Sequence, residues 1–376
     1  MRKAENAMFT PETGFALAKA GIGAQGVEAP STKAPKDDNL EQVLQQAKAR
    51  IVVVGCGGAG GNTISRIMAS GIHGCETIAV NTDAQDLLYT RANRKILIGK
   101  DTTGGLGAGN DPAKGENAAR EDEPVIKDNI YGMDLVFITC GLGGGTGTGA
   151  SPVVGEIAKK LGALTVGVVT LPFSVEGTRR RKNAEQGLER LRAVTDTVIV
   201  IPNDKLLQLA PDLPIGAAFK VSDQLLMDAI KGITEMITKP GLVNLDFADV
   251  RTVLQDGGVA MIGIGESDTS NRAEEAVEEA LNSPLLDVDI TGAKGAIVNV
   301  TGSPDMRLDE INKIIARVSE ALDTEANIIW GALYSEEMKN AIKVMVIISG
   351  VRSPYVLGLG TPRRKGEPID LGLESL

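Results

Sequence analysis

The chain is poor in residues on which many enzymes and metalloproteins depend. His73 is the only histidine among 376 residues, which excludes Ser-His-Asp and Cys-His catalysis and histidine-rich metal sites. The three cysteines, Cys56, Cys75 and Cys140, are an odd number without metal-ligand spacing. They are typical of reduced thiols in a cytoplasmic protein, and no metal site built from side chains is expected.

Long apolar runs and an excess of basic charge are also missing. No stretch approaches the roughly 20 apolar residues of a membrane span, and the N-terminus carries Arg2, Lys3 and Glu5 instead of the apolar core of a secretory signal. The net charge is −10, with a pI near 4.9. We therefore expect no nucleic-acid partner and no direct membrane insertion. A chain of 376 residues is long enough for two domains with separate cores.

Buried β-runs alternate with helical patterns between residues 50 and 203. This alternation predicts a doubly wound, mostly parallel sheet, in which ligands lie beyond the carboxyl ends of the strands. The expected strands are 50–55, 76–83, 94–99, 134–140, 164–172 and 196–203, and the principal helices are 63–71, 151–161 and 178–194.

The second half of the chain predicts a smaller α/β module after a long core helix. Apolar residues recur at helical spacing over 221–239, and Pro240-Gly241 stops the pattern. A β-α-β-α-β-β order then predicts a mixed four-stranded sheet. The expected organisation is a disordered extension at 1–36, a nucleotide-binding domain at 37–220, a central helix at 221–240, a second α/β domain at 241–352 and a flexible tail at 353–376.

The densest glycine run, Gly141–Gly149, follows a buried strand and precedes a helical pattern. Glycines let the backbone approach a ligand closely and adopt positive φ, and free N–H groups at a helix start form a nest for an anion. The run therefore predicts a phosphate site. The alternative is a flexible Gly/Thr linker, which would not be enclosed between a strand and a helix.

A second glycine-rich segment, Gly55–Asn62, is ambiguous. Gly55, Gly57 and Gly60 fit the G-x-G-x-x-G pattern of dinucleotide-binding folds, with Asp83 ending the next strand. An NAD-dependent oxidoreductase is therefore one alternative, although further glycine-rich loops on the same rim and the lack of an evident proton donor weaken it. No G-x-x-x-x-G-K-[ST] motif occurs, so phosphates must be held by backbone N–H groups and threonine hydroxyls.

Two charged segments offer candidate contacts or catalytic groups. Glu176 and Arg180 are four residues apart at a helix start, where an anion would offset the crowded cations; the alternative is a surface ion pair. Asp246 and Asp249 could form a capping box. Their functional interpretation is that they orient the water that attacks a γ-phosphate.

Seven motifs together resemble the FtsZ family, the tubulin-like GTPases of prokaryotic cell division, over about residues 50–350. In chain order they are GCGGAGGN at Gly55, NTD at Asn81, GGLGAGNDP at Gly104, GGGTGTG at Gly143, PFSVEGTRRR at Pro172, PNDKLL at Pro202 and NLDFADVR at Asn244. GGGTGTG and NLDFAD are more specific than any lone glycine motif.

The resemblance implies that the rim loops bind GTP or GDP. Asn203 and Asp223 would hydrogen-bond guanine, with Phe219 against the ring, and Glu176 and Arg180 would contact ribose and neighbouring groups. The remaining nucleotide contacts that it implies are Gly57, Gly58, Ala59, Gly60, Gly61, Asn62, Asn81, Gly107, Ala108, Gly109, Gly144, Gly145, Thr146, Gly147 and Thr148.

The resemblance also implies that the site is completed by another subunit. Asn244, Asp246 and Asp249 would enter the nucleotide pocket of the next copy, so hydrolysis would require a head-to-tail filament. Mg²⁺ would be held mainly through phosphate and water. The expected function is that of a polymerising GTPase in the cytoplasm, at a mid-cell division ring.

The two ends of the sequence add weaker expectations. The N-terminal extension and the missing long linker suggest an archaeal member. The final IDLGLESL is either a docking peptide for a membrane tether or division regulator, or an unstructured tail. A non-catalytic GTP-binding regulator of the same fold is the remaining alternative.

Overall fold

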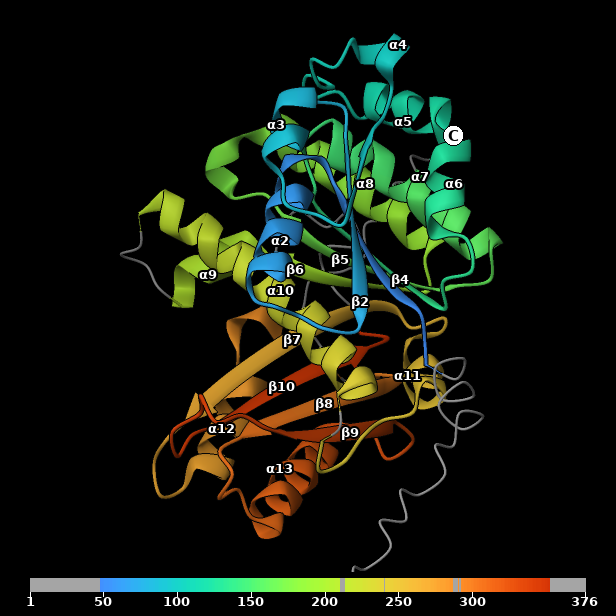
Figure 1. Ribbon diagram of the computed structural model, residues 1–376. Coiled ribbons are helices and arrows are strands. Elements are labelled where there is room, and N and C mark those ends of the chain that lie inside the picture. The colour runs from blue at the N-terminus through green and yellow to red at the C-terminus, as the bar shows by residue number, and fades with distance from the viewer. Residues whose placement is uncertain (1–47, 210–213, 240, 287–289, 291, 352–376) are drawn as a thin grey trace, which may run out of the picture. The chain divides into compact units, whose positions relative to one another are not determined.

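One ten-stranded sheet runs through the described part of the computed structural model, which comprises residues 48–209, 214–239, 241–286, 290 and 292–351 (Figure 1). The predicted extension at 1–36 and tail at 353–376 lie outside the described residues. The strand order is β3-β2-β1-β4-β5-β6-β7-β10-β8-β9. Within these described ranges, no helix is both long enough and apolar enough to cross a bilayer.

The first six strands form the predicted parallel sheet, because their residues are almost all apolar and both faces are covered. The strands are β1 Ile51–Cys56, β2 Cys75–Asn81, β3 Arg94–Leu97, β4 Leu135–Gly141, β5 Leu164–Leu171 and β6 Thr197–Pro202. The connecting helices are α2 Gly57–Ala69, α3 Ala84–Tyr89, α4 Lys100–Thr103, α5 Pro112–Glu121, α6 Glu123–Ile130, α7 Thr146–Lys160, η2 Ser174–Glu176, α8 Thr178–Val194 and α9 Asn203–Leu209.

The last four strands form the mixed sheet that the sequence predicts. Strand β10 is antiparallel to both β7 and β8, and β8 is parallel to β9. The elements are α11 Phe247–Leu254, β7 Gly258–Ser267, α12 Arg272–Leu281, η3 Pro284–Leu286, β8 Gly295–Gly302, α13 Leu308–Ala321, β9 Asn327–Tyr334 and β10 Ile342–Ser349.

The two sheets are continuous, which the sequence did not predict. Strands β6 and β7 pair in parallel over three residues, beginning with Thr197 beside Gly258. Gly258 has φ +68° and its N–H donates to the Asp196 carbonyl at 3.0 Å. A turn that only glycine adopts easily therefore brings the second half alongside the first.

The central helix α10 spans Ile215–Thr238 and begins six residues before its predicted start at Val221. It packs on the same sheet face as α2 and α11, and its apolar residues Ile230, Ile233 and Met236 are fully buried there. Helices α5–α8, α12 and α13 cover the opposite face. The longer helix matters for the site, because it carries Phe219, which precedes the predicted start, as well as Asp223.

Helices begin inside both glycine runs, although the predicted helices 63–71 and 151–161 start only after them. Helix α2 starts at Gly57 and α7 at Thr146, so Pro152 lies within α7. The glycines permit close helix packing. A Cβ on Gly149 would lie 2.1 Å from the Pro112 carbonyl oxygen, and one on Gly115 would lie 2.4 Å from the Gly145 carbonyl oxygen. The flexible-linker alternative is therefore wrong.

Replacing Gly149 by alanine should destabilise the fold. The added methyl group would overlap the α5 backbone, and such overpacking costs about 1–3 kcal/mol of unfolding free energy. Urea denaturation measures the loss. Gly216→Ala is the matched control, because its Cβ would meet no atom within 4 Å and should change stability by less than about 1 kcal/mol. Equal stabilities of the two variants would contradict the packing role of Gly149.

Candidate nucleotide-binding site

A cavity of about 480 Å³ lies at the carboxyl ends of the parallel strands, where doubly wound sheets bind their ligands. Its walls come from the loops after β1, β2, β3, β4, β5 and β6, and from the first turns of α10. The predicted residues that line it are Gly57, Gly58, Ala59, Asn81, Gly107, Ala108, Gly109, Gly144, Gly145, Thr146, Gly147, Glu176, Arg180, Asn203, Phe219 and Asp223.

Two helix N-termini meet at one end of the cavity. Gly57 has φ +70°, and a Cβ there would lie 2.9 Å from the Gly147 nitrogen. Neither α2 nor α7 has a side-chain cap, so no capping side chain occupies the N–H groups of their first turns. The N-terminal dipoles of both helices favour negative charge. This end of the cavity suits phosphate without a lysine.

Hydrogen bonds within the rim hold its loops in place. The Thr82 and Thr146 hydroxyls are 2.6 Å apart, which joins the loop after β2 to the start of α7. Asn81 accepts from the Thr82 N–H at 2.8 Å and donates to the Asp86 carboxylate at 2.7 Å. The Asp83 carboxylate caps α3 by accepting from two backbone N–H groups. This cap does not support the ribose hydrogen bond that a dinucleotide-binding site would require from Asp83.

Three predicted contacts at the start of α2 do not line the cavity. A Cβ on Gly60 would lie 2.6 Å from the Thr139 carbonyl oxygen, and one on Gly61 would meet the Thr90 hydroxyl at 3.0 Å. Both glycines thus serve close packing of α2. Asn62 borders a separate cavity on the outer side of the helix. Their phosphate contacts stay a prediction.

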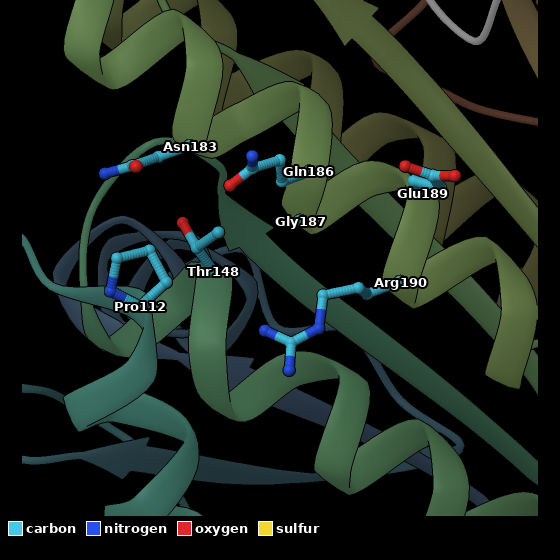
Figure 2. Close-up of a pocket in the computed structure, with 7 residues that line it drawn as sticks. All are labelled: Pro112, Thr148, Asn183, Gln186, Gly187, Glu189 and Arg190. Atoms are coloured by element: carbon cyan, nitrogen blue, oxygen red, sulfur yellow. The ribbon is translucent and has the colours of Figure 1, made fainter.

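Thr148 does not line the cavity at the carboxyl ends of the strands either. It lines a smaller cavity of about 220 Å³ together with residues of α8. Figure 2 shows its side chain between Pro112 and the Asn183 and Gln186 side chains. Its hydroxyl accepts from the Gly143 N–H at 2.9 Å, and the Asn183 amide donates to the Gly143 carbonyl at 3.3 Å. Thr148 therefore stabilises the glycine loop, and this geometry does not support a direct ligand contact.

Aromatic and polar groups line the opposite end of the cavity. The Phe219 ring is 40% exposed and packs edge-on against Phe173, with ring centroids 5.1 Å apart. Asn203 is buried, and its carbonyl oxygen accepts from the Ser222 hydroxyl at 2.7 Å. Asp223 lies next to Ser222 on α10. An exposed ring face beside an amide and a carboxylate suits a nucleobase.

Asp223 is a partly buried acid with one cationic partner. Its side chain is 16% exposed, and the Arg66 Nε atom lies 3.4 Å from Oδ2. Burial raises the pKa of the Asp223 carboxyl above its usual value, and Arg66 offsets part of this rise.

The predicted pairing of Glu176 with Arg180 is confirmed. Glu176 accepts from the Arg180 guanidinium and, at 2.8 Å, from the Phe173 N–H. Its side chain is mostly buried, whereas Arg180 is about half exposed at the cavity. The pair therefore belongs to the cavity wall and is more than a surface ion pair. Its contact with ribose remains a prediction.

The candidate catalytic residues Asn244, Asp246 and Asp249 do not line the cavity. Asp246 precedes α11 but its carboxylate makes no cap bond, so the capping-box alternative is wrong. Both aspartates are exposed, and no partner is found for either carboxylate among the described residues. The Asn244 carbonyl oxygen accepts from the Gly241 N–H at 2.6 Å, which closes the loop on itself.

Helix α10 separates these aspartates from the cavity. Phe219 lines the cavity, and Thr238 lies 19 residues later on the same helix, a rise of about 28 Å. The Thr238 hydroxyl reaches the His73 carbonyl at 3.5 Å, just before the amino end of β2. The loop that carries the candidate catalytic residues thus lies near the amino ends of the strands, opposite the cavity.

Two protein-family models match separate parts of this chain. Residues 50–211 match the Tubulin/FtsZ family, GTPase domain, and residues 258–352 match the FtsZ family, C-terminal domain. The chain is 59% identical to cell division protein FtsZ 1 of Thermococcus kodakarensis, over 93% of this chain and 96% of that protein. The chain belongs to the tubulin/FtsZ family. This membership confirms the predicted recognition and the GTPase activity.

Other relatives and solved structures agree with this assignment. FtsZ 1 of Pyrococcus abyssi is 62% identical, over 85% of this chain and 86% of that protein. The structure of an empty FtsZ dimer from M. jannaschii is 58% identical, with a TM-score of 0.81 over 84% of this chain and 92% of that chain. These relatives are archaeal, as expected. A GTPγS-bound CetZ2 protofilament from Haloferax volcanii, 22% identical with a TM-score of 0.71 over 82% of this chain and 96% of that chain, shares the fold.

Some residues of the FtsZ-like cavity were not predicted from the sequence. Asp86, Asn110 and Ser222 also line it, and Arg66 contacts Asp223 from α2. Asn110 could have been found because it directly follows the glycine-rich loop Gly104–Gly109. Ser222 could have been found from its position beside Asp223. Arg66 has no local signal, because it is 157 residues from its partner.

The position of Asp223 predicts a pH dependence of guanine nucleotide binding. A raised pKa means that the carboxyl binds its proton at a higher pH than free aspartate, so the ionised acceptor is lost as pH falls. Affinity for a fluorescent GTP analogue should weaken about tenfold or more between pH 7 and acidic pH. Nucleotide phosphates also titrate, so Asp223→Asn is the control. A wild-type profile parallel to that of the variant would contradict the role of Asp223.

Proposed function

We propose that this protein binds GTP in the rim cavity and hydrolyses it within head-to-tail filaments that serve cell division. The supporting observation is the separation of two half-sites. The cavity has phosphate-facing helix ends and a base end but no catalytic carboxylate from the loop after α10. The loop after α10 carries Asp246 and Asp249 near the opposite ends of the strands. Both side chains are exposed, and neither has a partner among the described residues.

A head-to-tail contact would bring the two half-sites together. One copy's aspartates would then face the phosphate end of the next copy's cavity. Because such a contact uses two different surfaces, each added copy exposes the same pair again and a filament grows. The half-site arrangement therefore links hydrolysis to assembly.

Within the assembled site, the chain's groups have separate roles. The first-turn N–H groups of α2 and α7 stabilise charge on the phosphates, and Arg180 lies on the wall where it can neutralise more. Asp246 and Asp249 would orient the attacking water, and Asn244 would hold the loop. Asn203, Phe219 and Asp223 would bind guanine, while Gly107–Gly109 would close over the phosphates.

A divalent cation fits this cavity through the nucleotide. Mg²⁺ would be held mainly through phosphate oxygens and water, as it is in many nucleotide sites. The Thr146 hydroxyl and the Asp83 and Asp86 carboxylates are among the side-chain oxygens of the cavity wall. Mg²⁺ would neutralise charge on the transferred phosphoryl group.

We base the proposed cellular role, cell division, on the relatives of this chain. The relatives are cell division proteins, so we place this GTPase in the division ring at mid-cell. A membrane tether or division regulator would bind the C-terminal tail, which lies outside the described residues. The NAD-dependent alternative makes a different prediction, tight NADH binding without GTP binding.

Light scattering after addition of GTP and Mg²⁺ tests nucleotide use and assembly together. We expect scattering to rise with GTP and to fall as GTP is consumed, because assembly creates the complete sites. GDP is the control and should give no rise. Scattering that is unchanged by GTP, together with tight NADH binding, would exclude the proposed function. GTP binding without turnover or assembly would instead support the regulator alternative.

Asp246→Ala should retain GTP binding, because Asp246 lies outside the cavity. It should lose most of its turnover, because it lacks the carboxylate that would orient the attacking water. Removal of a water-orienting group lowers kcat by about 100-fold or more. Phosphate release measures turnover. Asp268→Ala, which also removes an exposed carboxylate from the second half, is the matched control and should be unaffected.

Mixing Asp246→Ala with a variant impaired in its cavity, Asp223→Ala, tests whether the half-sites come from different copies. The first variant keeps an intact cavity and the second an intact catalytic loop, so mixed filaments contain complete sites. Turnover should exceed the sum of the two separate activities. A mixture that is only additive would show that the aspartates act within their own chain.

A further inference from the structure

We propose that Arg66 is a positioning residue that fixes the choice of guanine by holding the Asp223 carboxylate from behind. The proposal rests on the proposed binding of GTP in the rim cavity. It concerns a residue outside the motifs that identify the family, on the middle of α2.

The contact between Arg66 and Asp223 joins two helices that form different walls of the site. Arg66 lies on α2, beyond the glycine start that faces phosphate, and Asp223 lies on α10. Their Nε and Oδ2 atoms are 3.4 Å apart, and the two side chains are 33% and 16% exposed. In the described part of the chain, no other donor bonds the Asp223 carboxylate.

Guanine makes specific demands on this carboxylate. Its N1–H and N2–H₂ groups are adjacent donors, so both carboxylate oxygens must face the base and be ionised. Burial opposes ionisation and also limits the water that could otherwise solvate the acid. A guanidinium against Oδ2 favours the charged form and restricts rotation of the carboxylate, because its N–H groups are fixed in one plane.

The other charged groups around Asp223 do not replace Arg66. Arg91 and Lys220 line the outer cavity with Asp223, but neither forms an ion pair with it among the described residues. The charged groups that share the nucleotide cavity with Asp223 are Asp83, Asp86, Glu176 and Arg180. Glu176 and Arg180 pair with each other, and Asp83 caps α3.

The surroundings of Arg66 make it suitable for substitution. Its side chain borders an outer cavity of about 500 Å³, next to Asn62, Ser65 and Arg91. Truncation therefore widens an open cavity and leaves no enclosed void in the core. Arg91→Met is the matched control, since it removes a cation from the same cavity without touching Asp223.

The test measures the affinity of a fluorescent GTP analogue for wild type, Arg66→Met, Arg66→Lys and Arg91→Met across the acidic pH range. Arg66→Met should bind about tenfold more weakly at pH 7, and its loss of affinity on acidification should begin at a higher pH than in wild type. Arg66→Lys keeps the charge without the planar fork and should be intermediate. Arg91→Met should stay within about twofold of wild type.

A second measurement separates positioning of Asp223 from a general structural role. Asp223→Asn replaces the acid by an amide that can accept from N1–H and donate to the 2-oxo group of xanthine, so this variant should prefer xanthosine triphosphate. Adding Arg66→Met to it should change xanthosine triphosphate affinity by no more than about twofold, because the amide has no charge to hold and no proton to lose.

The outcomes distinguish the two proposals. Wild-type affinity and an unshifted pH profile in Arg66→Met would overturn the role of Arg66 while leaving the GTP site intact. An equal loss with the native Asp223 and in the Asp223→Asn background would also overturn it, since Arg66 would then act on the fold and not on the carboxylate. Absence of GTP binding by the wild-type protein would overturn the proposed function, and this role with it.

Discussion

The structure depends on the contact between Gly57 and Gly147, where two helices start against each other at the end of the sheet. The backbone of Gly147 also lies against the Cys56 and Gly141 carbonyls, which a Cβ would approach to 3.2 and 3.0 Å. A side chain at Gly57 would need positive φ and would lie 2.9 Å from the Gly147 nitrogen, and one at Gly147 would push its neighbours by a few tenths of an ångström. Because the helices meet so closely, their first-turn N–H groups can act on one anion, and the cavity needs neither a P-loop lysine nor a histidine.

The carboxylates that line the phosphate end already have partners: Asp83 caps α3, Asp86 accepts from Asn81, and Glu176 pairs with Arg180. Backbone N–H groups stabilise negative charge but do not orient a nucleophile by accepting its protons. The exposed carboxylates of Asp246 and Asp249 can do so, yet α10 separates them from the cavity by most of its length. Under the proposed function, hydrolysis would wait for the aspartates of a second copy.

The class of fold and most of the site were predictable, because their signals are local. Buried strands, helix periods and glycine runs predicted the sheet and its rim, and α8 has the predicted bounds of 178–194. Helix starts inside glycine runs were missed, since glycine's low helix propensity is outweighed here by packing against Thr139 and Pro112. The joined sheet and the Arg66–Asp223 contact depend on distant residues and have no local pattern.

Helix α10 connects the nucleotide cavity to the loop that carries Asn244, Asp246 and Asp249. Its first turns carry Phe219 and Asp223, and its last turn leads to Asn244. Between them, the Gly232 carbonyl accepts from the Asn299 amide at 3.1 Å and Lys343 pairs with Asp228 at 2.9 Å, so the helix is bonded to β8 and β10 of the second half. A Cβ at Gly232 would lie 2.0 Å from Met345 Cε. These contacts fix the middle of the helix to the second half of the sheet. In the proposed filament, α10 would therefore connect the base end of one copy's cavity to the loop that faces the next copy.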